Sequence, residues 1–174
     1  GRIANRRRSF GNAIVSRWPI LWSRGVMLPK TRLADTFDLQ RGYIEAVVAV
    51  PAGPLRVYST HLSHVGPQQR LPQVAALMDA VNRAPATGGT WDTAAGETLM
   101  FQEPAPAVPT SAIVAGDFNF TPAHPEYSLV CGMPGKHGRL ATAEHLSDAW
   151  AAAGNGEEGV NSFPHEGRID HVFV

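Results

Sequence analysis

The chain has 174 residues, of which 44% are hydrophobic and 17% are charged, and its formal net charge at pH 7 is zero. This composition supplies enough apolar side chains for the core of one domain, and it excludes an intrinsically disordered chain. The single cysteine excludes an internal disulfide, and no apolar run reaches the roughly 18 residues that a transmembrane helix requires.

Apolar segments bounded by turn residues predict β-strands. These segments are residues 13–16, 43–50, 55–62, 112–115 and 168–174. The second and third flank the turn sequence Pro51-Ala52-Gly53-Pro54, so we expect them to form a hairpin.

Helical periodicity is clear over residues 68–83, where apolar residues recur at every third or fourth position. Pro72 is compatible with this helix only if it lies in the first turn. A shorter helix is expected to begin near Ala123, and a third over residues 147–153, ended by Gly154. This mixture of helices and hairpin-like strands predicts an α/β fold with antiparallel or mixed sheets.

Residues 84–111 differ from the rest of the chain. They are rich in Ala, Pro, Gly and Thr and show no period. A loop of this length is unusual inside a compact domain and is often functional. We therefore interpret residues 1–174 as a single domain with a long insertion at 84–111, and Trp91, Met100 and Phe101 indicate that this insertion is packed.

The strongest signal for chemistry is the sequence Gly116-Asp117-Phe118-Asn119, which follows a predicted strand. The glycine lets a ligand approach the backbone, and the Asp117 carboxylate could bind a cation or orient water. Asn119 could donate a hydrogen bond to a phosphate oxygen. The same four residues also suit an ordinary turn closed by the aspartate side chain.

Two further segments carry polar side chains at strands. His61 ends one predicted strand, where its imidazole could contact a phosphate or move a proton, whereas we interpret His64 as structural. Asp170 lies in an otherwise apolar strand, so we expect it to be buried and paired. It would either orient a catalytic histidine or form an ion pair with Arg168.

Taken in order, these segments resemble the endonuclease/exonuclease/phosphatase superfamily, in its bacterial-type members, which have the DNase I-like fold. The segments that carry the resemblance are residues 11–20, Ser59-Thr60-His61-Leu62, Arg70 with Gln73, Gly116-Asp117-Phe118-Asn119 with Thr121-Pro122, Ser147-Asp148-Ala149-Trp150, and residues 168–173. The resemblance implies a four-layered α/β sandwich of two mixed sheets flanked by helices. It also implies a divalent cofactor, Mg²⁺ or Mn²⁺.

The resemblance implies a role for each candidate site residue. Asp117 would bind the metal and position the attacking water, and Asn119 would hold that water or the phosphate. His61 would contact the scissile phosphate. Asp170 would orient a second catalytic histidine, and Asn12 would line the substrate site.

A metal-dependent phosphoesterase, which hydrolyses phosphodiester or phosphomonoester bonds with activated water, is therefore the expected function. Its substrate would be a nucleic acid, an inositol phosphate or a phospholipid head group. Residues 1–41 hold nine Lys and Arg against two acidic residues, which favours a polyanion, although no basic and aromatic stripe typical of a dedicated nucleic-acid binder is present.

Two parts of the family pattern are not found, a metal-binding Glu before this region and a Ser-Asp-His motif after it. We therefore interpret the chain as a fragment that lacks both ends of the domain, and we expect it to be inactive alone. The alternative is a non-catalytic binding module of the same fold. An unrelated metallophosphoesterase is disfavoured, because paired histidines around an aspartate are missing. No secretory signal is recognisable, so a cytoplasmic monomer is the default expectation.

Overall fold

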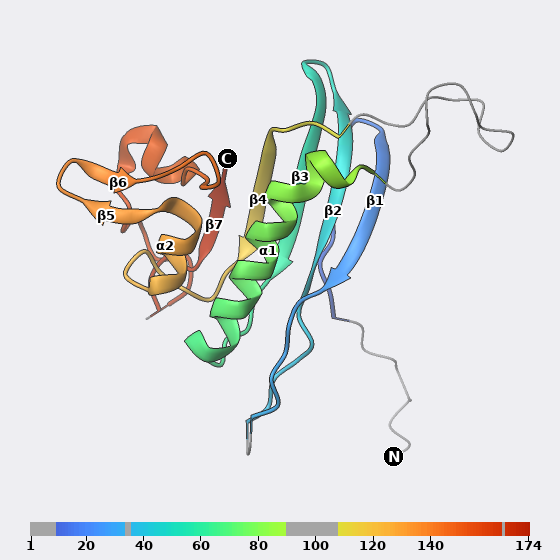
Figure 1. Cartoon of the computed structure of the whole chain (residues 1–174). Coiled ribbons are helices and arrows are strands. Elements are labelled where there is room, and N and C mark those ends of the chain that lie inside the picture. Colours follow the sequence, from blue (N-terminus) through green and yellow to red (C-terminus); the bar gives the residue numbers. More distant parts are fainter. Residues whose placement is uncertain (1–9, 34–35, 90–107, 165) are drawn as a thin grey trace, which may run out of the picture.

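The structure is a computed structural model that describes residues 10–33, 36–89, 108–164 and 166–174. Its centre is a five-stranded sheet with the strand order β1-β2-β3-β4-β7 (Figure 1). The strands are β1 (Ile20–Met27), β2 (Gly42–Val50), β3 (Gly53–His61), β4 (Ala112–Asp117) and β7 (Asp170–Phe173). Strands β3 and β4 are parallel and the other neighbours in this sheet are antiparallel, so the sheet is mixed.

Helix α1 (Pro67–Thr87) lies across one face of this sheet (Figure 1). It begins with a proline, which suits the first helical position because the backbone N–H has no helical partner there. Its buried residues Val74, Leu77 and Val81 belong to the same core cluster as Tyr58 and Val114 of the sheet. Each such side chain contributes roughly 1.5–3 kcal/mol by burial, so this face of the sheet is the main core.

The connection from β3 through α1 to β4 determines where functional residues can meet. Because β3 and β4 are parallel, their carboxyl ends lie at the same edge of the sheet. Helix α2 (Pro125–Cys131) lies beside α1, and the buried Arg70 and Glu126 join the two helices with an N–O distance of 2.7 Å. A two-stranded sheet of β5 (Met133–Gly135) and β6 (Gly138–Leu140) and the π-helical turn η1 (Ala151–Asn155) follow.

The expected α/β class, the hairpin, the long helix and the strand before Asp117 are confirmed. The last strand is shorter than predicted, and the helix expected near Ala123 begins at Pro125. Residues 149–155 are helical, close to the third predicted helix. Pro72 lies in the second turn of α1 and not in the first, and it is tolerated on the exposed side of the helix.

One expectation about the elements is wrong, a second lies mostly outside the described residues, and two strands were not expected. Residues 13–16 form no strand, and the strand in this region is β1, because its residues pair with β2 at the sheet edge. Strands β5 and β6 were not predicted. The predicted insertion begins inside α1, and most of it, residues 90–107 with Trp91, Met100 and Phe101, lies outside the described residues.

Candidate active site

Three of the predicted site residues meet at one end of three neighbouring strands of the central sheet. His61 is the last residue of β3, Asp117 is the last residue of β4, and Asp170 is the first residue of β7. In the strand register His61 lies opposite Asp117, and Asp117 lies opposite Asp170. Directly opposed residues place their side chains on the same face of a sheet. Residues Tyr58 and Thr60 alternate with His61 and are buried, so the three site residues occupy the face opposite α1.

Gly116 is required by the contact between β3 and β4. Its φ is +152°, and a Cβ atom at this position would lie 1.9 Å from the carbonyl oxygen of Thr60. The glycine therefore lets the two strands approach each other, whereas the sequence suggested that it admits a ligand. Backbone hydrogen bonds from Leu62 N to Asp117 O and from Phe118 N to Ile169 O, both of 2.9 Å, hold the segment between its neighbours.

Asn119 closes the turn that follows Asp117. Its backbone N–H donates to Asp117 Oδ1 at 3.0 Å, and its side-chain Nδ2 donates to the carbonyl of Leu62 at 3.0 Å. Its φ of +53° is a conformation that asparagine tolerates better than most residues. The turn interpretation is confirmed, with Asp117 Oδ1 closing the turn. The other carboxylate oxygen, Oδ2, lies 3.3 Å from His61 Nε2.

Asp170 is exposed, so the expectation that it is buried and paired is wrong. The alternative ion pair with Arg168 is wrong too, because Arg168 instead contacts Asp148 at 2.5 Å. Strand alternation places the next residue, His171, in the core with an exposed fraction of 2%. The main-chain N–H of Asp170 donates to Ser162 Oγ at 3.0 Å, which holds the start of β7 in place.

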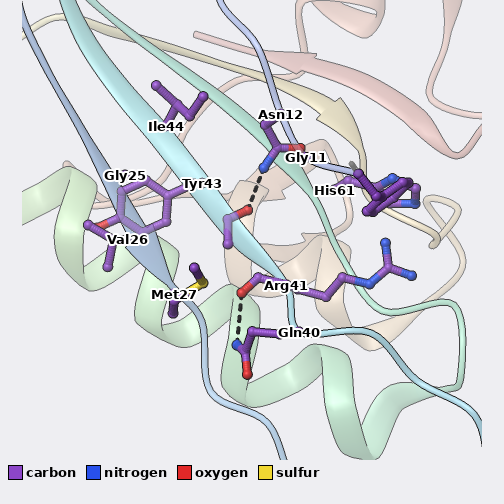
Figure 2. A pocket seen from close by; sticks show the side chains of 12 residues that line it. Gly11, Asn12, Gly25, Val26, Met27, Gln40, Arg41, Tyr43, Ile44 and His61 are labelled. Carbon is purple, nitrogen blue, oxygen red and sulfur yellow. Dashed lines mark hydrogen bonds between the residues drawn. The ribbon is translucent and has the colours of Figure 1, made fainter. Parts of the chain in front are cut away.

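Asn12 lies beside a pocket at the same edge of the sheet (Figure 2). Its Nδ2 donates to the carbonyl of Gly42 at 2.7 Å, which attaches the segment before β1 to the start of β2. The pocket has a volume of about 230 Å³, and His61 and Arg41 are among its lining residues. Asn12 therefore shares the pocket wall with His61, whereas Asp117, Asn119 and Asp170 are not among the lining residues.

Arg41 is a site residue that the sequence did not single out. It directly precedes β2, has an exposed fraction of 4%, and extends toward His61 in Figure 2. Its Nη2 lies 3.2 Å from His64 Nδ1, and Asp38 Oδ1 lies 3.8 Å from its Nε. Within the described part of the chain, Nε and Nη1 have no hydrogen-bond partner. Nothing in the sequence distinguishes Arg41 from the eight other basic residues of segment 1–41, because its burial depends on the fold.

The surroundings of His61 lower its pKa. Burial is the largest cause and the positive charge of Arg41 the next, while Asp117 and Asp170 act in the opposite direction. The ring of Phe10 lies against the imidazole, with 5.4 Å between the ring centroids. His61 is thus mainly neutral at pH 7, with one ring nitrogen able to donate a hydrogen bond and the other able to accept one.

The pKa of His61 should respond to its two charged neighbours in opposite directions. The Arg41→Gln variant is expected to raise this pKa, because a positive charge is removed, and the Asp117→Asn variant is expected to lower it. A titration of the imidazole signals by NMR measures both shifts in the same buffer. Shifts of the same sign in the two variants would contradict the described geometry.

Asp117 and Asp170 are the carboxylates available for a divalent cation. Like charges on directly opposed strand residues are unfavourable, so a cation beside them would relieve their repulsion. Mg²⁺ keeps several water molecules and is commonly held by one or two carboxylates together with substrate phosphates. The pair fits this kind of site. Among the residues that the structure describes, no group of three or more His, Cys, Asp or Glu side chains could hold a metal ion.

Solved structures with the same fold come from several organisms. The human Nocturnin catalytic domain with a bound sulfate anion aligns with 90% of this chain and 48% of its own, at 17% identity and a TM-score of 0.56. For the mannosyl-6-phosphatase of Bacteroides thetaiotaomicron the values are 90%, 52%, 16% and 0.55. For D. rerio TDP2 complexed with a single-strand DNA product they are 88%, 52%, 19% and 0.52.

These likenesses show the fold, and the chain spans about half the length of the structures that it matches. No curated protein matches the sequence. Among the described residues, no helix combines the length and the hydropathy needed to cross a membrane. The sequence pattern of the Endonuclease/Exonuclease/phosphatase family matches residues 3–174, nearly the whole chain. The chain therefore belongs to the endonuclease/exonuclease/phosphatase family.

Proposed function

We propose that this protein is a metal-dependent phosphoesterase that hydrolyses phosphate esters with water. One observation carries the proposal: His61, Asp117 and Asp170 meet at the same end of neighbouring strands, near the buried Arg41, whose Nε and Nη1 make no hydrogen bond among the described residues. Phosphate esters resist hydrolysis because their anionic oxygens repel a nucleophile. Positive charge at the site would reduce this repulsion, and a carboxylate would align the attacking water.

Asp117 would hold Mg²⁺ or Mn²⁺, with Asp170 beside it, and the bound cation would neutralise phosphate charge. Asp117 Oδ2 would also orient the attacking water. The neutral imidazole of His61 would hydrogen-bond a phosphate oxygen, and Arg41 would contribute a fixed positive charge. Asn119 would keep one amide N–H for the substrate, because the other is engaged by Leu62.

The similar structures support phosphate-ester chemistry without identifying the substrate. One contains a sulfate anion, one is described as a sugar phosphatase, and one contains a DNA product. Nucleic acid, inositol phosphates and phospholipid head groups all present the phosphate that this site would bind.

Phosphate binding by the 174-residue chain tests the proposal directly. Inorganic phosphate is expected to bind with chemical-shift changes at His61 and Asn119 in an NMR titration. The Arg41→Gln variant should bind it about tenfold to a hundredfold more weakly, because a charge-assisted hydrogen bond is lost.

Arg83→Gln provides the matched control, because Arg83 is exposed on α1 and pairs with Asp79. It should leave phosphate binding unchanged. Equal binding by the wild-type chain and the Arg41→Gln variant would overturn the assigned anion site. Phosphate binding without hydrolysis in every longer form of the protein would instead favour a binding module.

A further inference from the structure

The pocket beside His61 has an apolar part and a charged end. Met27 and Ile44 contribute apolar side chains, while Arg41 and His61 form the charged end (Figure 2). The ring of Phe10 lies against both Arg41 and His61. Its volume is about 230 Å³. An apolar cavity of about 150 Å³ is large enough to hold benzene, so this pocket has room for one flat ring with a substituent.

Gly25 is an exposed residue of β1 at the rim of this pocket. A Cβ atom added to Gly25 would meet no atom within 4 Å, and the residue is not among the glycines with a positive φ. Gly42 on β2, which lies opposite Met27, is different, since a Cβ atom on Gly42 would lie 2.6 Å from the carbonyl oxygen of Val26. The glycine at position 42 is therefore required for strand contact, whereas the glycine at position 25 is required neither by the backbone nor by packing.

The charged end indicates which ligands would suit the pocket. Arg41 is almost completely buried, its Nε and Nη1 atoms make no hydrogen bond among the described residues, and Asp38 Oδ1 lies 3.8 Å from Nε, beyond hydrogen-bond distance. Buried donors without a hydrogen bond are costly, and an oxygen atom of an anionic ligand would satisfy them. The Phe10 ring lies 5.6 Å from the Arg41 guanidinium, so an aromatic surface adjoins the cation.

We propose that this pocket binds the organic group of a phosphate ester when that group is a single flat apolar ring. The phosphate would lie between Arg41 and His61, and the ring would enter the space above Gly25 and lie against Phe10. Gly25 would then determine which esters the protein accepts, because any larger side chain there would occupy the place of the ring. The proposal rests on the phosphate site of the proposed function and adds the substrate class.

Two phosphonates that resist hydrolysis, one with a phenyl ring and one with a methyl group, allow the contribution of the ring to binding to be measured separately from that of the phosphate. Phenylphosphonate is expected to bind at least about tenfold more tightly than methylphosphonate, because the ring loses its contact with water in the pocket. The Gly25→Leu variant should reduce this ratio to about one while inorganic phosphate binds as in the wild type. The Gly25→Ala variant, which adds one carbon atom, should give an intermediate ratio.

Ser23→Leu is the matched control, because Ser23 lies on the same face of β1, two residues before Gly25 and outside the pocket lining. It should keep the wild-type ratio. Thermal unfolding of each variant shows whether it is folded, and the ratio for Gly25→Ala decides if the leucine variant is not.

Each pattern of results has one meaning. If no variant and no wild-type chain binds inorganic phosphate, the proposed function itself fails. If phosphate binds but phenylphosphonate binds no better than methylphosphonate, the ring pocket alone is refuted. A ratio that is high in the wild type and unchanged by Gly25→Leu would place the ring elsewhere and would also refute the assignment.

Discussion

Replacing Asp117 with alanine is expected to lower hydrolysis of a phosphate ester at least about a hundredfold, in any active form of the protein that includes these residues. The carboxylate lies at the convergence of three strands, opposite both His61 and Asp170. Its side chain is partly exposed, with Oδ2 at 3.3 Å from His61 Nε2. Removing it takes away the proposed metal ligand and the group that aligns the nucleophile.

The fold should survive this change, because the neighbouring strands are joined through backbone atoms at residues 117 and 118. The side chain contributes one hydrogen bond, from Asn119 N, whose loss costs about 1 kcal/mol. Initial rates and urea unfolding should be measured on the same preparations. The Asp117→Asn variant separates charge from shape, since it keeps an acceptor for the turn and should be nearly as inactive. Turnover equal to that of the unchanged protein would refute the role of Asp117.

Replacing Arg168 with methionine is expected to lower the free energy of unfolding by about 3–5 kcal/mol. Arg168 is buried, with Nη2 at 2.5 Å from Asp148 Oδ2 and Nη1 at 2.8 Å from His171 Nδ1. The hydroxyl of Tyr127 donates to the same Asp148 oxygen at 2.7 Å. Without the arginine, Asp148 would remain as a buried carboxylate lacking its counter-charge. The exposed pair of Arg83 and Asp79 offers a control, and Arg83→Met should cost less than about 1 kcal/mol.

The pH dependence of this loss follows from the pKa of Asp148. Burial alone would raise that pKa, but the contacts with His171, Arg168 and Tyr127 outweigh burial and hold it well below its ordinary value. A carboxyl whose pKa is lower in the folded state stabilises the fold above its unfolded pKa of about 3.9, and this contribution is lost as the pH falls. The difference between wild type and Arg168→Met, measured by urea unfolding, should therefore shrink below about pH 4. A difference that is independent of pH would mean that lost packing, and not the charge, explains the destabilisation.

Local patterns in the sequence were sufficient for most of the central fold. The turn Pro51-Ala52-Gly53-Pro54 and its flanking apolar runs correctly predicted the hairpin of β2 and β3. The helical period correctly predicted α1, and the order of the motifs indicated the family. The placement of Asp117 at a strand end beside His61 also agrees with the structure, because parallel strands joined by a helix end at the same edge.

The errors concern properties that depend on distant partners. Residues 13–16 carry β-branched side chains yet form no strand, while β1 forms because β2 is available beside it. Asp170 was expected in the core because its strand is apolar, but the register with β4 turns it outward. The importance of Arg41 arises from its burial near residues that are far away in the sequence, so no local pattern could indicate it.

Asp170 and His171 point to opposite faces of β7, so the register of β7 against β4 decides which of the two side chains lies beside Asp117. That register depends on the length of the segment that precedes β7. A slip of β7 by one residue against β4 would exchange the two, so that an imidazole would face Asp117 and a carboxylate would enter the aromatic surroundings of Phe118 and Phe173. The strand has four residues, so its backbone pairing alone resists such a slip weakly, and the Arg168–Asp148 pair adds an anchor beside it. A change of one residue in the length of the segment between Ser162 and Arg168 would thus place a carboxylate and an imidazole, in place of two carboxylates, at this end of the strands, although Asp117, Asp170 and His171 would all remain in the sequence.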